Sequence, residues 1–358
     1  MKTDLDILIM AAGLGTRMRS DRAKVLHHLD GRPLVNHVVE AALGLDPSSV
    51  CVIVGHQAEN VKAVVDQEFR DERVCFAIQE KQLGTGDAIA ATRPRYANSD
   101  STIVVLTGDV PLITTSTIRA MIDQHGSAGC AATLLSVRLP DPTGYGRIVR
   151  NGEAGFERIV EQKDATDAEK LIDEVNAGFY CFYSRALYDA LSRLSNNNAQ
   201  GEYYLTDIPS ILMADGQQIG VYVAPHPGEV EGINDRRQLA ALEATLRERT
   251  IQKLMLEDGV TFVDPKTAYV SSRSAVGRDT VVYQNVTIEG KSVIGVGCTI
   301  RPGTRIVDSE VGSGVEIRDN CFITDSTVGD NCTLGPMAHL RGHAVMIEGS
   351  KVGNFVEL

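Results

Sequence analysis

The sequence predicts an α/β domain with a mostly parallel sheet, followed by a connecting helix and a parallel β-helix. In the first part of the chain, short apolar runs alternate with amphipathic helical stretches, which is the pattern of βαβ units. A charged stretch with leucines at helical spacing comes next. From Val276 onward, aliphatic residues recur every six positions, and hexapeptide repeats of this kind build parallel β-helices.

The strands that we expect in the first domain are short apolar runs, and amphipathic stretches separate several of them. The runs are Leu5–Met10, Val50–Val54, Ile103–Leu106, Ala131–Val137 and Gly178–Tyr183. We expect helices over Leu34–Leu43 and Ala58–Phe69. Ligands of such sheets bind beyond the carboxyl ends of the strands. The loops that follow the first and third runs should therefore lie on the binding edge.

The connecting helix is expected over Asp235–Leu256. It carries Leu239, Leu242 and Leu246 on one stripe among many charged residues, which indicates an amphipathic helix.

The repeat region has two slips of one residue in its period of six. Its aliphatic positions are Val276, Val282, Ile288, Ile294, Ile300, Ile306, Val311, Ile317, Ile323, Val328, Leu334, Leu340, Met346, Val352 and Leu358. We expect each side chain to point inward and to stack on its equivalent in the next coil. Ordinary antiparallel strands have a period of two, which gives no reason for a spacing of six. Because the chain ends on a repeat position with no capping segment, we expect the repeat array to be incomplete here.

Composition restricts the class of protein. A chain of 358 residues is too long for one ordinary core, so two domains are expected. The net charge of −12 argues against a nucleic-acid or anionic-membrane partner. The seven cysteines form no Cys-x-x-Cys motif, which favours reduced thiols over disulfides or a zinc site. No signal peptide or membrane-spanning run is recognisable, so we predict a cytoplasmic protein.

The loop after the first apolar run is the strongest functional signal. It reads Met10-Ala11-Ala12-Gly13-Leu14-Gly15-Thr16-Arg17-Met18, with Lys24 a few positions further on. A buried strand that leads into a glycine-rich turn lets backbone N–H groups approach phosphate oxygens, and the two cations add charge. The third glycine of a dinucleotide fingerprint and the Gly-Lys-Ser/Thr of a P-loop are missing. The loop therefore predicts a nucleoside triphosphate site.

Two further loops have both a functional and an ordinary interpretation. Thr107-Gly108-Asp109 follows a strand run, so Asp109 could bind Mg²⁺ or could simply initiate a turn before Pro111. In the segment Gln79–Asp87, the glycines allow close backbone approach and an amide could pair with a base edge. Thr85 could equally be the N-cap of a helix over Ala88–Thr92.

The remaining candidates are weak when taken singly. The segment Asp141–Arg147 is a loop by its turn residues, and Glu161 and Asn176 are isolated polar residues beside apolar runs. Asn234 precedes the connecting helix, where it could be an N-cap or a metal ligand. The eight histidines accompany no nucleophile motif, so Ser/His/Asp and Cys/His catalysis gain no support.

Taken together, these motifs identify a family. The chain closely resembles the bacterial bifunctional N-acetylglucosamine-1-phosphate uridyltransferase/glucosamine-1-phosphate acetyltransferases over its whole length. The stretches that carry the resemblance are Ala11–Met18, Gln82–Gly86, Gly108–Pro111, Asp141–Arg147, Asn196–Asp207, Glu229–Asn234 and Gly353–Glu357. The first of these marks sugar-nucleotide pyrophosphorylases in general, whereas Asn196–Asp207 and Glu229–Asn234 are more specific to the bifunctional enzymes.

The resemblance implies a domain organisation and an activity. It implies a Rossmann-like nucleotide-diphosphosugar transferase domain over 1–236, a linker helix over 237–257 and a left-handed β-helix acetyltransferase domain over 258–358, with trimerisation through the β-helix. The implied reaction converts UTP and N-acetylglucosamine 1-phosphate to UDP-N-acetylglucosamine and pyrophosphate with Mg²⁺, towards peptidoglycan and lipopolysaccharide precursors.

The resemblance also implies roles for particular residues. Arg17 and Lys24 are the expected catalytic residues, in contact with the phosphates, and Asp109 and Asn234 are the expected Mg²⁺ ligands. The remaining substrate-binding candidates are Met10, Ala11, Ala12 and Gly13 for uridine and phosphate, Gln79, Gly84 and Thr85 for uracil, Thr107 and Gly108 beside Asp109, Gly146, Glu161 and Asn176 for N-acetylglucosamine, and Arg341 for the acetyltransferase site.

The chain departs from the family pattern at three places. Ala23 stands where family members usually have proline before the lysine, so we expect the loop at Lys24 to be less rigid. Leu14 stands where the family often has lysine. The lysine, histidine and tyrosine that should follow Arg341 would lie beyond Leu358, so we expect no acetyl transfer from acetyl-CoA, which is a co-substrate of the full-length enzymes.

Two rival assignments stay open. A glucose-1-phosphate adenylyl- or thymidylyltransferase would share the opening motif. A regulatory protein of the same two-domain plan, similar to subunits of the eukaryotic translation-initiation exchange factor, should lack the set of Arg17, Lys24 and Asp109.

Overall fold

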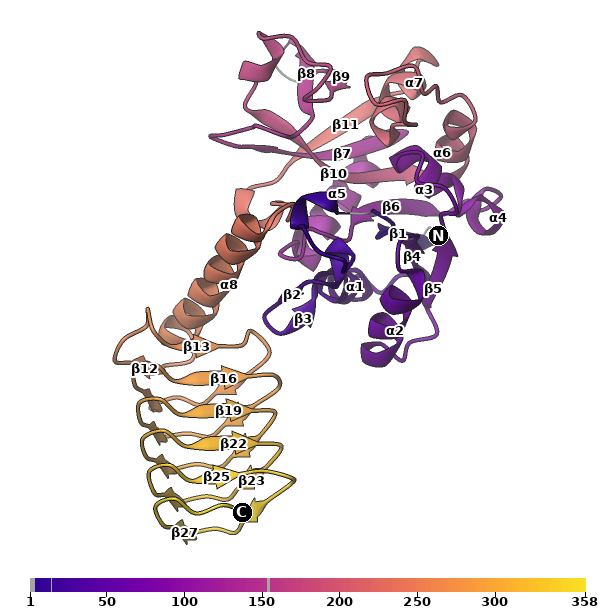
Figure 1. Cartoon of the computed structure of the whole chain (residues 1–358). Coiled ribbons are helices and arrows are strands. Elements are labelled where there is room, and N and C mark those ends of the chain that lie inside the picture. Colours follow the sequence, from indigo (N-terminus) through magenta and orange to yellow (C-terminus); the bar gives the residue numbers. More distant parts are fainter. Residues whose placement is uncertain (1–3, 14, 153–154) are drawn as a thin grey trace. The chain divides into compact units, whose positions relative to one another are not determined.

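The computed structural model describes residues 4–13, 15–152 and 155–358. The chain divides into two compact units, Met1–Leu239 and Ala240–Leu358. The first contains the α/β fold, and the second contains most of the long helix α8 (Arg236–Leu256) and the stacked coils (Figure 1). The predicted fold class, an α/β domain with a mostly parallel sheet followed by a left-handed parallel β-helix, is confirmed.

The first unit is built on one large sheet. Its main strands run in the order β11-β7-β10-β6-β1-β4-β5. They are β1 (Leu5–Met10), β4 (Ser49–Val54), β5 (Val74–Ile78), β6 (Thr102–Thr107), β7 (Ala132–Arg138), β10 (Glu174–Tyr183) and β11 (Ile219–Val223). The pairs β1–β4, β1–β6, β4–β5 and β7–β11 are parallel, whereas β10 runs antiparallel to both of its neighbours. All five predicted apolar runs are therefore strands, and β10 begins four residues before the run that predicted it.

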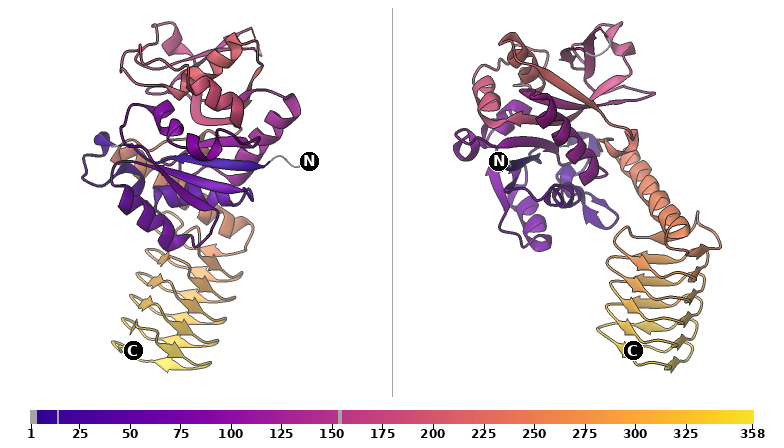
Figure 2. Two further views of the ribbon diagram at one scale, coloured as in Figure 1. Left: turned by 90° about the vertical axis from the view of Figure 1, so that its right-hand side faces the viewer. Right: turned by 180° about the vertical axis from the view of Figure 1, so that it is seen from behind.

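Helices cover both faces of this sheet because successive side chains of a strand point to opposite sides. Ile7 and Ile9 of β1 pack with α1 (Leu34–Leu43), α2 (Ala58–Glu68) and α5 (Thr115–Ala128). Leu8 lies in a second core with α3 (Thr85–Ala90), α4 (Arg93–Tyr96), α6 (Ser184–Leu191) and α7 (Ile208–Ala214). Figure 2 shows this layering from two further sides.

Shorter elements complete the first unit. They are the strands β2 (His28–Leu29), β3 (Arg32–Pro33), β8 (Arg147–Asn151) and β9 (Gly155–Val160), and the 3-10 helices η1 (Thr16–Met18), η2 (Lys24–Leu26), η3 (Glu169–Leu171), η4 (Leu205–Asp207) and η5 (Pro227–Glu229). The elements η1 and η2 are the ones that matter for the site, because they carry the two expected catalytic cations.

The long helix α8 (Arg236–Leu256) differs from its prediction. Of the leucine stripe, Leu242 is buried whereas Leu239 and Leu246 are half-buried, so the stripe predicted for an amphipathic helix is only partly covered. Near its end, Ile251 and Leu254 pack into the core of the β-helix. The helix is anchored there by its last turns rather than by a stripe along its length.

The second unit is the predicted β-helix, with three parallel sheets formed by stacked coils. The predicted inward positions pair from coil to coil, as in the column Val282, Ile300, Ile317, Leu334 and Val352. The strands are β12 (Thr261–Phe262), β13 (Tyr269–Val270), β14 (Ala275–Val276), β15 (Val281–Val282), β16 (Thr287–Glu289), β17 (Val293–Ile294), β18 (Thr299–Ile300), β19 (Arg305–Val307), β20 (Glu310–Val311), β21 (Glu316–Ile317), β22 (Phe322–Thr324), β23 (Thr327–Val328), β24 (Thr333–Leu334), β25 (His339–Leu340), β26 (Val345–Met346) and β27 (Lys351–Val352).

Close packing of consecutive coils explains the glycines that follow the inward-pointing residues of the β-helix. A Cβ atom on Gly295 would lie 2.6 Å from the carbonyl carbon of Gly312 in the next coil. The backbones of consecutive coils therefore approach too closely at this corner for any side chain. Among the described residues, no helix is both long and apolar enough to cross a membrane.

Candidate active site

A cavity of about 390 Å³ opens at the carboxyl ends of the central strands of the first unit. Met10, the last residue of β1, is the register partner of Thr107, the last residue of β6, so the two following loops start side by side. The cavity is lined by Met10, Ala11, Ala12, Gly13, Lys24, Val25, Gln79, Gln82, Gly84, Thr85, Ala88, Thr107, Asp109 and Glu202. This is the edge at which the βαβ pattern places a ligand.

The loop after β1 leaves room for a ligand. A Cβ atom on Gly13 would meet nothing within 4 Å, so this glycine is not needed for packing within the protein. Gly15 is different, because its φ is +63° and an added Cβ would lie 2.5 Å from the Cβ of Lys24. The missing side chain at Gly15 thus lets the loop pack directly against the residue that carries the second expected catalytic cation.

Four side chains from distant segments meet beside this loop. The ammonium group of Lys24 forms a short ion pair with Asp109 and lies 3.3 Å from Oδ1 of Asn234. Arg17 donates from its guanidinium to the same Asn234 oxygen at 2.8 Å. The predicted catalytic pair and the predicted metal ligands therefore form one network.

Asn234 is not the N-cap of α8, contrary to the ordinary interpretation of its position. Asp235 has that role, since its Oδ1 accepts from the N–H groups of Arg237 and Gln238 at 2.8 and 2.9 Å. Because Asp235 caps the helix, the side chain of Asn234 is free to face Arg17 and Lys24.

The side-chain oxygens of Asp109 and Asn234 fit a Mg²⁺ ion that is also bound by substrate phosphates. No group of three or more His, Cys, Asp or Glu side chains within the described ranges could enclose a metal ion. Asp109 and Asn234 supply one carboxylate and one amide oxygen, both directed at the same ammonium group. Protein-bound Mg²⁺ commonly takes one or two carboxylates and completes its shell with waters and substrate phosphates. These two residues thus suit a cation that arrives with a triphosphate.

Gln79 is held in a single orientation at another wall of the cavity. Its Nε2 donates to the carbonyl of Gly84 at 3.0 Å and to the carboxylate of Asp87 at 2.8 Å. Because both partners only accept, the amide cannot be reversed. Gly84 has a φ of +117°, and a Cβ there would lie 2.5 Å from the carbonyl of Tyr203. The glycine is required by this close approach.

Thr85 does not cap a helix, so the prediction that it could be an N-cap is wrong. It is the first residue of α3, after Gly84 as the N-cap. Its Oγ1 instead accepts from the N–H of Leu205 at 2.9 Å. The side chain therefore links the Gln79–Asp87 segment to the stretch Asn196–Asp207.

Three of the remaining candidates gather beside β10, outside the lining of the cavity. The N–H of Asn176 donates to the carbonyl of Gly146 at 2.8 Å, and a Cβ on Gly146 would lie 3.6 Å from the carboxyl carbon of Glu161. Thr206 donates to Oε1 of Glu161 at 3.2 Å. The structure thus brings together the residues that the resemblance assigns to the sugar.

Burial raises the pKa of Glu161 above its usual range, and the carboxylates of Asp164, Asp207 and Glu202 act in the same direction. The hydrogen bond from Thr206 opposes this effect because it favours the charged form. Burial also raises the pKa of Asp207. The surroundings of Glu161 are therefore acidic, in contrast to the cationic network at Arg17 and Lys24.

The sugar candidates are connected to the cavity through Thr107. The N–H of Gly178 donates to Oδ1 of Asn176 at 3.2 Å, and a Cβ on Gly178 would lie 3.3 Å from the side chain of Thr107. The Oγ1 of Thr107 is buried and has no hydrogen-bond partner among the described residues. Buried hydroxyls are seldom left unpaired, so this atom is a candidate for contact with a ligand.

Several predicted residues have other surroundings. The N–H of Gly108 donates to the carbonyl of Met10 at 2.9 Å, which joins the loops after β6 and β1. Arg341 belongs to the second unit, where it forms an ion pair with Glu357. Leu14 lies outside the described residues.

Sequence reasoning gave no role to some residues of the cavity. Gln82, Glu202, Val25 and Ala88 line it. Gln82 and Glu202 lie in the motifs Gln82–Gly86 and Asn196–Asp207, so the family resemblance could have marked them. The other two are apolar neighbours of Lys24 and Thr85, and no local signal separates them from ordinary core residues.

Comparison with known proteins shows the family to which this chain belongs. Residues 7–208 match the model of the MobA-like NTP transferase domain, and residues 267–357 match that of the GMPPB C-terminal domain. The protein named bifunctional protein GlmU from Lactobacillus johnsonii is 44% identical over 353 residues, which are 98% of this chain and 75% of that protein. The chain belongs to the GlmU family.

Other GlmU proteins agree with this membership. Bifunctional protein GlmU of Shouchella clausii is 45% identical over 351 residues, 98% of this chain and 76% of the relative. That of Syntrophomonas wolfei is 43% identical over 354 residues, 99% of this chain and 77% of the relative. As a member of the GlmU family with an NTP transferase domain, the chain is a nucleotidyltransferase.

Proposed function

We propose that this GlmU-family chain transfers the uridylyl group of UTP to N-acetylglucosamine 1-phosphate. The products are UDP-N-acetylglucosamine and pyrophosphate, and Mg²⁺ is required. The observation that carries the proposal is the convergence of Lys24, Arg17, Asp109 and Asn234 beside a cavity of about 390 Å³ at the carboxyl edge of the sheet. A triphosphate needs this combination of cations and metal-binding oxygens.

In the proposed reaction, a phosphate oxygen of the sugar phosphate attacks the α-phosphorus of UTP. One P–O bond forms there, and the bond from the α-phosphorus to the bridging oxygen breaks, so pyrophosphate leaves with that oxygen. Both reactants are anions, so positioning and charge neutralisation supply most of the catalysis. Arg17 and Lys24 would offset the charge that develops on pyrophosphate. Asp109 and Asn234 would hold Mg²⁺, which would supply further positive charge at the phosphates.

The specificity for uracil would reside in Gln79 and the backbone near Gly84. Since the Nε2 of Gln79 is already occupied, its oxygen remains as the acceptor for a ligand. The N3–H of uracil is a donor, whereas N3 of cytosine is an acceptor. This difference supports UTP over CTP as the substrate. Gly146, Glu161 and Asn176 would bind the N-acetylglucosamine group.

A turnover panel tests the proposal. The chain would be assayed for pyrophosphate release with UTP, CTP, ATP and dTTP, each against glucosamine, glucose and N-acetylglucosamine 1-phosphates with Mg²⁺. We expect UTP with N-acetylglucosamine 1-phosphate to react with the highest kcat/KM. A preference for ATP or dTTP with glucose 1-phosphate would support the rival nucleotidylyltransferases instead. Lack of turnover with every pair would support a regulatory role.

Two wider properties belong to the same proposal. We propose a homotrimer formed through the β-helix, whose coils expose large apolar side chains such as Phe322, Val345 and Ile347. We propose a cytoplasmic location, with which the free state of all seven cysteines agrees.

A further inference from the structure

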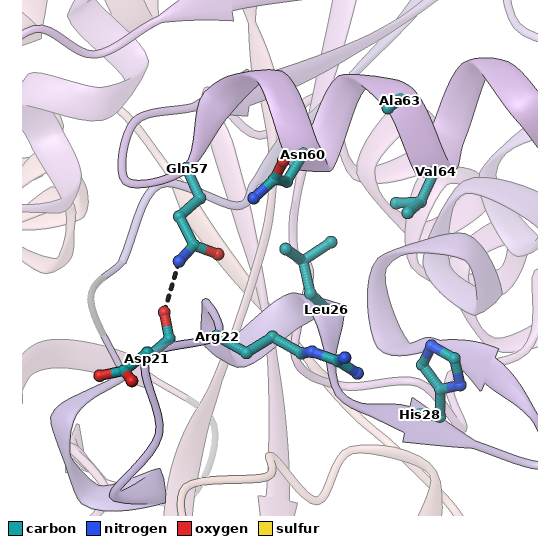
Figure 3. A pocket seen from close by; sticks show the side chains of 8 residues that line it. All are labelled: Asp21, Arg22, Leu26, His28, Gln57, Asn60, Ala63 and Val64. Atoms are coloured by element: carbon teal, nitrogen blue, oxygen red, sulfur yellow. Dashed lines mark hydrogen bonds between the residues drawn. The ribbon is translucent and has the colours of Figure 1, made fainter.

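The side-chain amide of Gln57 is bonded to the backbone that leads into Lys24. Its Oε1 accepts from the N–H of Ala23 at 3.0 Å, and its Nε2 donates to the carbonyl of Asp21. Figure 3 shows the second of these bonds, at the wall of a cavity that lies beside α2. Because each end of the amide has a partner of the opposite kind, its orientation is fixed. Gln57 thus holds Asp21 and Ala23, in the segment immediately before Lys24.

Gln57 is itself held firmly. Its φ of +54° lies in the left-handed region, which is uncommon for a residue with a side chain. The conformation is kept because its carbonyl accepts the first hydrogen bonds of α2, from Asn60 at 3.0 Å and from Val61 at 3.1 Å. Residues held in such conformations often serve function.

The turn before Gln57 also touches the loop after β1. A Cβ on Gly55 would lie 2.9 Å from the Cβ of Ala12, and the N–H of His56 donates to the carbonyl of Ala12 at 3.4 Å. One turn between β4 and α2 therefore contacts both the cavity loop and the segment that carries Lys24. It sets the position of each relative to the other.

We propose that Gln57 is a positioning residue that holds Lys24 in place for the reaction. This rests on the proposed function, in which Lys24 contacts the phosphates. The ammonium group of Lys24 is aimed at Asp109 and Asn234, and a loosened backbone at Asp21–Ala23 would let it leave this position. Gln57 makes none of these contacts to the reactants itself, so its effect passes through Lys24.

Residue 23 explains why a side-chain bond is useful here. Ala23 has φ −55° and ψ 142°, and a proline ring would by itself hold φ near this value. Alanine does not enforce it, but it retains the N–H that Gln57 binds. The hydrogen bond therefore replaces the rigidity that proline would supply, at the position where the sequence departs from the family pattern.

The first test replaces Gln57 by methionine, which has similar length but forms neither bond. We expect kcat for UTP to fall about 5- to 30-fold, the range for losing two hydrogen bonds that hold a catalytic group. The KM for N-acetylglucosamine 1-phosphate and the Tm should stay near their original values. Asn60→Ala, an exposed change in the same cavity wall, is the matched control and should leave kcat unchanged.

The second test combines Gln57→Met with Lys24→Met in a double-mutant cycle. If Gln57 acts through Lys24, Gln57→Met should have almost no further effect once the ammonium group is gone. An unchanged kcat in Gln57→Met, or an equal fall in both backgrounds, would overturn the inference. Failure of the proposed function gives a different result, since Lys24→Met alone would then retain the original turnover.

A rescue experiment adds independent support. Ala23→Pro removes the N–H but fixes φ, so a folded Ala23→Pro variant should lose less kcat on Gln57→Met than the original chain does. An equal loss in the folded Ala23→Pro variant would count against the positioning role. The double-mutant cycle with Lys24→Met decides the inference if Ala23→Pro does not fold.

Discussion

Lys24 and Asp109 form an ion pair at the edge of the cavity, and each keeps 18% of its side chain exposed. They come from different loops, after β1 and after β6, and the pairing of those strands brings them together. Each group holds the other in position while both remain accessible to a ligand. A substitution at one of them will therefore disturb its partner as well.

The first prediction concerns the two cations. Arg17→Ala and Lys24→Ala should each lower kcat about 10²- to 10³-fold, as expected when one preorganised electrostatic group is removed. Steady-state kinetics of pyrophosphate release measures this. Lys170→Ala removes a lysine that is paired with Asp167 outside the cavity, and it should leave kcat unchanged. Near-normal rates for both Arg17→Ala and Lys24→Ala would refute their assignment.

The second prediction separates the metal role of Asp109 from its support of Lys24. Asp109→Ala should abolish Mg²⁺-dependent turnover, because a carboxylate ligand is lost. In Asn234→Ala, where the Lys24–Asp109 pair can persist, we expect the Mg²⁺ concentration for half-maximal rate to rise. Titration of the initial rate with Mg²⁺ gives both results. Turnover of Asp109→Ala at ordinary Mg²⁺ concentrations would remove Asp109 from the metal site.

The third prediction uses the raised pKa of Glu161. A carboxyl group whose pKa is higher in the folded state stabilises the fold when protonated and loses this contribution as pH rises through the folded pKa. Glu161→Gln keeps the acceptor for Thr206 and removes the charge, so its unfolding free energy should exceed that of the original chain at neutral pH. The difference should vanish below the usual pKa of 4.5.

The same substitution should weaken sugar binding. Loss of a charged hydrogen-bonding group should raise the KM for N-acetylglucosamine 1-phosphate about 10- to 100-fold. Urea unfolding at several pH values, together with steady-state kinetics, measures the two effects. A Glu161→Gln variant with lower stability at neutral pH would contradict the pKa direction, and an unchanged KM would remove Glu161 from the sugar site.

The fourth prediction concerns His125, a buried residue in the last turn of α5. Burial lowers its pKa to about 4, although it lies in the last turn of a helix, where a positive charge is usually favoured. Because the unfolded chain takes up the proton at a higher pH, stability should be lost as pH falls from 6.5 toward 4, by about 3 kcal/mol.

A matched variant isolates this group. His125→Phe keeps a ring against Tyr183 and cannot be protonated. The difference in unfolding free energy between pH 7 and pH 4.5 should therefore be smaller in His125→Phe. An identical acid dependence of the two proteins would contradict the role of His125.

Local patterns predicted most of the fold because they depend on near neighbours. The period of six positions placed inward residues such as Ile300 correctly, since each coil repeats the same contacts. The apolar runs likewise marked strands. The leucine stripe of α8 did not predict which leucines are buried. Helical spacing alone does not show which side chains are covered by other parts of the protein.

The site was harder to predict wherever it depends on distant contacts. Arg17 and Asn234 are 217 positions apart, so their hydrogen bond has no local signal, and Asn234 resembled a helix cap. Thr85 likewise resembled a cap until its bond to Leu205 was seen. Gln57 had no signal at all, because its role depends on a backbone N–H of another segment. The family resemblance brought together several residues that single-residue patterns could not join.

A crystal structure of the chain with UDP-N-acetylglucosamine and Mg²⁺ tests the central claim most directly. We predict uracil beside Gln79, Gly84 and Thr85, the diphosphate near Arg17 and Lys24, and the sugar at Glu161 and Asn176. Electron density for the nucleotide sugar at another place, with this cavity empty, would contradict the account.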